Sequence, residues 1–154
     1  MRYDYPKFNT DIKEIVRQIR QDDIKFDLIV GIARGGAIPA IRLSHVLDVP
    51  CKILNWQTRD GDLYQDRNVA QQIATSVLLH SKKILFVDDM VDSGETFITL
   101  LAFMRSILSE DMMANIKKCA LIFNVEQQIK LDYYSFEIRR SVYPDWINFW
   151  WEEK

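Results

Sequence analysis

Residues 88–96 combine three aspartates and a glutamate with a short glycine turn, and their residue types suit a phosphorylated ligand. The run reads Asp88-Asp89-Met90-Val91-Asp92-Ser93-Gly94-Glu95-Thr96. It follows an apolar segment, residues 83–87, that predicts a buried strand, and it precedes a predicted helix at residues 97–108. The first N–H groups of a helix have no partner inside it, so together with the helix dipole they bind anions. Ser93 and Thr96 would add hydroxyl donors, and Gly94 would let a phosphate approach the backbone.

Asp88 and Asp89 do not suit the phosphate itself, because two carboxylates repel a dianion. Carboxylates accept hydrogen bonds from sugar hydroxyls, and a magnesium ion nearby would neutralise the charge. The run therefore predicts a ligand with a phosphate at one end and a vicinal diol in the middle. The structural alternative is a solvated strand end followed by Ser93 as an ordinary helix cap. The concentration of acids, hydroxyls and glycine in one run favours the ligand site.

A second turn, Ala-Arg-Gly-Gly at residues 33–36, follows the apolar residues 26–32, which predict another buried strand. Residues 37–46 continue as a predicted helix. Arg34 would supply a forked, permanently charged donor, and the N–H groups of the two glycines could reach phosphate oxygens. Taken alone, the turn is also consistent with a tight structural turn or a weak dinucleotide-binding pattern.

The remaining pattern predicts the architecture that positions these turns. Apolar residues at helical spacing predict a helix over residues 10–21, capped by Thr10 or Asp11, and short apolar runs predict strands at 51–56 and 119–123. Residues 57–67 are polar and aperiodic and predict a long loop. Alternating strands and helices imply an α/β fold with a mostly parallel central sheet flanked by helices. Ligands bind such sheets where strands end and helices begin.

The chain length fits a single domain over residues 1–154. We expect its core at about 24–125. Residues 1–8 and 126–154 fit the alternating pattern poorly and are expected to form a small hood over the strand tips.

Composition argues against several classes of protein. The net charge of −2 gives no sign of a basic surface built to hold nucleic acid, although it does not exclude DNA binding. No apolar run approaches the roughly 18 residues of a membrane span, and residues 1–6 lack the apolar stretch of a secretory signal, so a cytoplasmic location is expected. Cys51 and Cys119 form no CxxC pair, and we expect both to be small buried side chains.

The acidic run closely resembles the phosphoribosyl pyrophosphate motif of the type I phosphoribosyltransferases. That motif is an apolar strand, two acids, two apolar residues, then Asp-Thr/Ser-Gly-x-Thr, and every position here agrees, with Glu95 at the variable site. The resemblance implies that Asp88 and Asp89 face the ribose hydroxyls, with Asp89 also on Mg²⁺, and that residues 92–96 wrap the 5-phosphate. It further implies that Asp92 meets N7 of a purine, as general base or hydrogen-bond partner.

In the same family a strand ending in an Arg-Gly or Lys-Gly turn grips the pyrophosphate. That role would fall to Arg34 and Gly35, and the non-proline cis peptide that the family often has here would be Ala33–Arg34. The loop at residues 57–67 corresponds to the family's catalytic flap, which excludes water from the reacting centre. Many relatives carry a Ser-Tyr pair near the position where this chain has Thr-Arg. Three flap residues are candidate pyrophosphate contacts: Arg59, Tyr64 and Arg67.

The segment at residues 143–152, Tyr-Pro-Asp-Trp-Ile-Asn-Phe-Trp-Trp-Glu, is unusually aromatic. From residue types alone it could be a core-docking tail, an oligomer contact or a platform for a planar ligand. It resembles the Asp-Trp-Ile…Trp-Glu/Asp ending of the bacterial and archaeal xanthine, guanine and hypoxanthine phosphoribosyltransferases, and the whole resemblance spans residues 26–152. By that resemblance Trp146 covers the purine and Ile147 reads the base edge.

One position departs from that group. Its members generally place a lysine just after the fourth core strand, where it donates to the purine 6-oxygen. This chain reads Leu121-Ile122-Phe123-Asn124-Val125-Glu126 there. Asn124 is then the candidate donor to the base, and the preferred base stays open.

The resemblance therefore implies a Mg²⁺-dependent enzyme of purine salvage. It would transfer the 5-phosphoribosyl group from phosphoribosyl pyrophosphate to N9 of xanthine, guanine or hypoxanthine, releasing pyrophosphate, with Asp92 and Arg34 as catalytic residues. We expect a homo-oligomer, a dimer or tetramer, with no nucleic-acid or membrane partner. A non-catalytic module that senses phosphoribosyl pyrophosphate and a transferase for another nucleobase remain open. A phosphoacceptor receiver domain fits less well, because its paired acids follow the first strand rather than the third.

Overall fold

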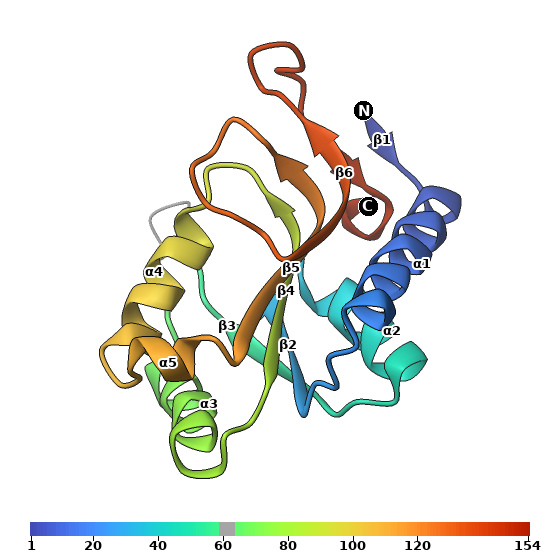
Figure 1. The fold of residues 1–154 in the computed structure, drawn as a ribbon. Coiled ribbons are helices and arrows are strands. Elements are labelled where there is room, and N and C mark those ends of the chain that lie inside the picture. Colours follow the sequence, from blue (N-terminus) through green and yellow to red (C-terminus); the bar gives the residue numbers. More distant parts are fainter. Residues whose placement is uncertain (59–63) are drawn as a thin grey trace.

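The computed structural model describes residues 1–58 and 64–154 and contains a central sheet of five strands, all parallel (Figure 1). In spatial order the strands are β3 (Cys51–Asn55), β2 (Leu28–Ala33), β4 (Ile84–Val91), β5 (Ile116–Asn124) and β6 (Tyr133–Ile138). The predicted parallel α/β sheet is confirmed. Its carboxyl edge carries both glycine turns, because β2 and β4 are neighbours in the sheet.

Helices cover both faces of the sheet (Figure 1). One face packs against α1 (Tyr5–Asp22) and α2 (Ala37–Leu47), and the other packs against α3 (Arg67–His80), α4 (Glu95–Arg105) and the short α5 (Glu110–Met113). Successive strand residues point to opposite faces, so each strand supplies both layers. In β4, Leu85 belongs to the first apolar cluster and Phe86 to the second. Both faces are thus buried, which explains the nearly continuous apolar runs in the sequence.

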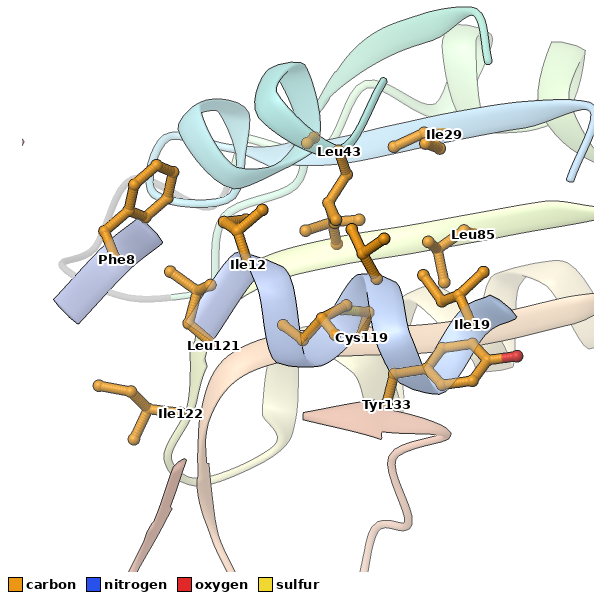
Figure 2. Packing of buried hydrophobic residues seen from close by; sticks show 14 of the residues in the cluster. Phe8, Ile12, Ile19, Ile29, Leu43, Leu85, Cys119, Leu121, Ile122 and Tyr133 are labelled. Carbon is orange, nitrogen blue, oxygen red and sulfur yellow. The ribbon is translucent and has the colours of Figure 1, made fainter. Parts of the chain in front are cut away.

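The first cluster lies between α1, α2 and the sheet (Figure 2). Ile12 and Ile19 of α1 belong to it together with Leu85 and Cys119 of the strands. Each fully buried isoleucine or leucine side chain contributes roughly 1.5–3 kcal/mol relative to an exposed one. The thiol of Cys119 is buried as expected, whereas Cys51 is exposed, because it begins the edge strand β3. That expectation for Cys51 was wrong.

Two helices differ from the prediction. Helix α1 begins at Tyr5 rather than near residue 10, because the side chain of Asp4 accepts a hydrogen bond from the Lys7 N–H at 3.0 Å and caps it. Helix α3 was not predicted. Its buried residues recur at helical spacing, and two of them are alanines: Ala70, Ile73, Ala74 and Val77. Alanines carry little hydrophobic signal, so the amphipathic pattern of this helix is weak in the sequence.

Two strands also differ. Strand β4 continues to Val91, so Asp88 and Asp89 lie within the strand rather than in a loop. Asp88 pairs with Ala120 of β5. Strand β6 belongs to the central sheet, although residues 126–154 were assigned to the hood. Its pairing with β5 keeps the chain in the core as far as residue 138.

The hood is built from both chain ends. Strand β1 (Arg2–Tyr3) pairs in parallel with β7 (Asn148–Phe149), which leads into a 3₁₀ turn, η1 (Trp150–Glu152). The amino group of Met1 donates to the Trp146 carbonyl at 2.9 Å. Within the described ranges, no helix is both long and apolar enough to cross a bilayer.

Candidate active site

A cavity of about 400 Å³ opens at the carboxyl ends of β2 and β4, under the hood. Its lining brings together residues that the sequence analysis selected from three distant segments: Arg34, Gly35, Asp88, Asp89, Asp92, Thr96, Trp146 and Ile147. A smaller hollow of about 20 Å³ adjoins it and is lined by residues of the acidic run, including Ser93, Gly94 and Glu95. The first two segments meet because the carboxyl ends of the parallel strands β2 and β4 share one edge, and the hood brings Trp146 and Ile147 to the same cavity.

The smaller hollow lies at the start of α4. Gly94 precedes the helix with φ +82°, a left-handed conformation that side chains rarely adopt, and it has no side chain to cap the helix. The Ser93 hydroxyl accepts a long hydrogen bond from the Glu95 N–H at 3.4 Å. A ligand oxygen would replace this weak contact, because the first N–H groups of a helix favour anions. The Thr96 hydroxyl lies beside them, 3.4 Å from the hydroxyl of Thr58.

Asp89 is held against the Arg34–Gly35 turn, where its carboxylate contacts the α-carbon of Gly35. Burial raises the pKa of Asp89 to about 6, and the negative charge of Glu152 adds to this effect. The side chain of Asp88 accepts a hydrogen bond from the Asp89 N–H at 2.9 Å. This end of the cavity therefore concentrates negative charge, which a cation or donor hydroxyls would relieve.

The residues present fit a Mg²⁺ ion that is shared with a ligand. Within residues 1–58 and 64–154, no cluster of three or more His, Cys, Asp or Glu side chains could hold a metal alone. Mg²⁺ usually binds one or two carboxylates and keeps waters or substrate oxygens as its other ligands. Asp89, with Asp88 beside it, supplies such a partial set of hard oxygen donors.

The Arg34 turn has the predicted backbone: the Ala33–Arg34 peptide is cis. The Arg34 side chain is exposed and lines the cavity. The Gly36 N–H donates to the Ile32 carbonyl at 2.9 Å, so it is not free for a phosphate. Of the two glycines, Gly35 is the one that lines the cavity.

Asp92 is paired with a residue that no motif indicated, Arg140. The Arg140 Nε and Nη2 atoms each lie 3.0 Å from one Asp92 carboxylate oxygen, a two-pronged ion pair. The hydrogen bonds to the Asp92 carboxylate raise the pKa of Arg140 above its ordinary value. Asp92 is thereby fixed in orientation at the cavity wall.

The predicted contact of Asn124 with the base needs correction. Asn124 is 1% exposed and does not line the cavity. Its amide donates to the Asp92 carbonyl at 3.2 Å, and its side-chain oxygen accepts from the Glu126 N–H at 3.3 Å. Because both ends of the amide are engaged, Asn124 supports Asp92 instead of facing a ligand.

Of the three candidate flap residues, the structure describes Tyr64 and Arg67 and places both away from the cavity lining. Arg59 lies outside the described residues. Tyr64 is 58% exposed and away from the cavity lining, and its carbonyl accepts from the Gln57 N–H in a short antiparallel stem. Arg67 opens α3, and its guanidinium lies 5.7 Å from the ring centre of Phe103 rather than in the cavity. At the start of this segment Gln57 and Thr58 reach the lining instead, together with Trp56 just before it.

The hood provides the far wall. Trp146 is 61% exposed and offers a flat apolar surface, whereas Ile147 beside it is 2% exposed. Glu152 and Arg140 also line the cavity and were not selected from the sequence. Glu152 ends the aromatic segment at residues 143–152, and its place in the Trp-Glu ending of that segment is a signal that could have identified it. Arg140 lies in no motif, so only the folded hood reveals it.

Comparisons with known proteins agree on the family. The model of the phosphoribosyl transferase domain matches residues 3–154. A curated xanthine-guanine phosphoribosyltransferase from Cereibacter sphaeroides is 36% identical over 74 residues, which are 44% of this chain and 41% of that relative. The aligned stretch thus spans less than half of that relative.

Solved structures resemble the whole chain. A purine phosphoribosyltransferase from Pyrococcus horikoshii superposes with a TM-score of 0.72 at 26% identity, covering 100% of this chain and 94% of the other. A Helicobacter pylori xanthine-guanine-hypoxanthine phosphoribosyltransferase gives 0.66 at 23% identity, covering 98% and 92%, and supports the fold. The chain therefore belongs to the phosphoribosyl transferase domain family and has the type I phosphoribosyltransferase fold.

Proposed function

We propose that this protein transfers the 5-phosphoribosyl group of phosphoribosyl pyrophosphate to N9 of a 6-oxopurine, as in purine salvage. One observation carries the proposal: the Arg34 turn, the Asp88–Asp89 strand end and Trp146 line one cavity. The cavity thus combines hydrogen-bond donors for an anion, acceptors for hydroxyl groups and a planar apolar wall, which are the groups that this substrate pair needs. The names of the similar purine and xanthine-guanine phosphoribosyltransferases support the choice of base.

The sugar phosphate would bind along the acidic run. The 5-phosphate accepts hydrogen bonds from the first N–H groups of α4 and from Ser93 and Thr96. The ribose hydroxyls donate to Asp88 and Asp89. Arg34 and the Gly35 N–H hold the pyrophosphate. Bound Mg²⁺, held by Asp89 and substrate oxygens, would offset charge on the pyrophosphate.

The reaction breaks the bond between ribose C1 and pyrophosphate and forms the bond from C1 to N9. Positive charge develops on the ribose as pyrophosphate leaves, and Arg34 stabilises the leaving group's negative charge. Asp92 accepts a hydrogen bond from N7–H of the purine and takes up that proton as N9 bonds to carbon. Trp146 covers the ring and, with the hood, excludes water that would hydrolyse the ribosyl cation.

The proposal includes a cytoplasmic location, which is usual for purine salvage, and a homo-oligomer. Light scattering on the purified chain measures the oligomeric state directly. A dimer or tetramer is expected, and a monomer at micromolar concentration would contradict this part of the proposal.

Pyrophosphate release tests the function. The purified protein is incubated with phosphoribosyl pyrophosphate, Mg²⁺ and one base at a time: xanthine, guanine, hypoxanthine, adenine, uracil or orotate. Release is expected with 6-oxopurines and not without a base. Release with uracil or orotate alone would retract the purine assignment. Binding of phosphoribosyl pyrophosphate without release for any base would favour a sensing module.

A further inference from the structure

The end of the cavity that would hold the purine base contains a cationic side chain, that of Arg140. Arg140 follows β6, and its guanidinium reaches the wall formed by Asp92 and Trp146. The Arg140 and Asp92 side chains are 21% and 23% exposed, so their ion pair is largely shielded from water while one side still faces the cavity. Among the described residues that line this cavity, Arg34 and Arg140 are the cationic ones. Arg34 lies on the β2 turn, so Arg140 is the cation on the hood side.

Asn124 and Val125, at and just after the end of β5, do not line this cavity. Asn124 bonds to Asp92 and Glu126, as described above. Val125, which immediately follows β5, lines a separate cavity together with Phe136 and Ile138 of β6. Neither residue could donate to a base in the main cavity without a local rearrangement.

The donors of Arg140 are almost fully used. A guanidinium has five N–H groups. Nε and one N–H of Nη2 bond to Asp92, and Nη1 donates to the carbonyls of Tyr143 at 3.3 Å and Asp145 at 2.6 Å. For the second N–H of Nη2, the partner within the described residues is the sulfur of Met90 at 4.0 Å. A thioether is a weak acceptor, so a ligand oxygen would replace it readily.

The chemistry of purines makes this donor selective. Beside N7, a 6-oxopurine presents an acceptor oxygen, whereas a 6-aminopurine presents an N–H donor. Arginine is the common partner of the N7 and O6 edge in nucleic-acid recognition. A fixed N–H of Arg140 therefore matches an oxo group and opposes an amino group.

We propose that Arg140 determines the specificity of this site, its Nη2 donating to the purine 6-oxygen and thereby selecting 6-oxo over 6-amino bases. This assignment rests on the proposed function. The two Nη1 bonds support it, because they fix the carbonyls of residues 143 and 145 just before Trp146. The guanidinium that contacts the base edge thus also positions the ring that covers the base.

Calorimetric binding of inosine and adenosine 5′-monophosphates tests the assignment without requiring turnover. A hydrogen bond to a charged group predicts that the wild-type protein prefers the inosine nucleotide by about 10- to 100-fold. Arg140→Gln should reduce this preference to less than about threefold, while affinity for phosphoribosyl pyrophosphate with Mg²⁺ stays within about threefold. Arg139→Gln is the matched control. Arg139 is exposed and lines the other cavity, so its loss should leave the preference unchanged.

Arg140→Gln leaves the Asp92 carboxylate without its cation, which destabilises the fold. A second pair of variants therefore keeps the test valid if Arg140→Gln does not fold. Asp92→Asn retains Arg140 and is the reference against which the preference of the double variant is measured. The double variant Asp92→Asn with Arg140→Gln removes both charges and should lose it. An unchanged preference in either folded Arg140 variant overturns the assignment, as does an equal loss of affinity for both nucleotides and phosphoribosyl pyrophosphate.

The proposed function and this inference fail separately. A wild-type protein that prefers the inosine nucleotide through Arg140 but forms no nucleotide would refute the enzyme and leave the recognition role standing. A wild-type protein that transfers phosphoribose yet binds both nucleotides equally would refute the recognition role alone.

Discussion

The carboxylate of Asp89 lies so close to the α-carbon of Gly35 that a β-carbon at position 35 would overlap it. The Arg34–Gly35 turn and the end of β4 are therefore fitted to each other through the side chain of Asp89. Position 35 has no room for even a methyl group unless Asp89 moves.

Gly35→Ala should displace the Asp89 carboxylate and lower kcat/KM for phosphoribosyl pyrophosphate by about 100-fold, since small displacements of positioning groups have effects of that size. Steady-state kinetics and thermal unfolding measure the two consequences. Gly35→Ala combined with Asp89→Ala removes the overlap and should regain melting temperature without regaining activity. Wild-type kcat/KM in Gly35→Ala would contradict the fitted arrangement.

The proposed phosphate site at the start of α4 predicts a ligand-dependent change in melting temperature. Phosphoribosyl pyrophosphate with Mg²⁺ should raise it in the wild type, because the ligand binds the native state. Gly94→Val combined with Thr96→Ala should abolish this rise, because valine does not tolerate φ +82° and one hydroxyl donor is lost.

Thr10→Ala is the control for that variant. The Thr10 hydroxyl donates to the Pro6 carbonyl on α1, far from the cavity in sequence and outside its lining. Its loss should leave the ligand-dependent rise intact. A full rise in the folded double variant would exclude residues 88–96 from the site.

Asp92→Asn should keep binding of phosphoribosyl pyrophosphate and lose turnover. An amide at this position still accepts a hydrogen bond from Arg140 but does not take up the N7 proton, and a positioned general base contributes roughly 10²–10⁴-fold. Single-turnover kinetics with saturating substrates measure the loss. Undiminished turnover would show that Asp92 serves only to anchor Arg140.

The raised pKa of Asp89 predicts how stability depends on pH. Its pKa is about 6 in the folded protein against an ordinary 3.8. Between these values the native state binds more protons than the unfolded chain, so this group lowers the free energy of unfolding as pH rises. The difference corresponds to an effect on the order of 3 kcal/mol, complete above the folded pKa.

Asp89→Asn should remove that dependence. Urea unfolding of both proteins at several pH values, with a chelator present, gives the difference in free energy of unfolding. The variant should gain stability relative to the wild type as pH rises from about 4 to 7, because only the wild type must ionise a buried carboxylate. A difference that does not change with pH would contradict the burial of a charged Asp89.

The sequence predicted the parts of the site that lie next to one another along the chain. Residues 88–96 and the Arg34 turn are short runs whose chemistry follows from local backbone geometry. The predicted ends of strands and helices were less accurate where contacts with neighbouring elements determine them. Asp88, for example, belongs to β4 because it pairs with Ala120 of β5. The alanine-rich face of α3 and the membership of β6 in the sheet likewise depend on neighbouring elements.

Hydrogen bonds and ion pairs between residues far apart in the sequence could not be predicted from the sequence pattern. Asn124 follows an apolar strand and was a reasonable donor to the base, yet the fold directs it to Asp92. Arg140 is 48 residues from Asp92 in the sequence, and nothing in its own segment indicates the ion pair. Such contacts depend on how the hood closes over the sheet.

The most direct test of the account is the identity of the product. The protein is incubated with phosphoribosyl pyrophosphate, Mg²⁺ and a 6-oxopurine, and the mixture is analysed by mass spectrometry and NMR. We predict a 5′-nucleotide joined through N9, formed in equal amount to the pyrophosphate released. Ribose 5-phosphate and pyrophosphate with no nucleotide, for every 6-oxopurine tried, would contradict it.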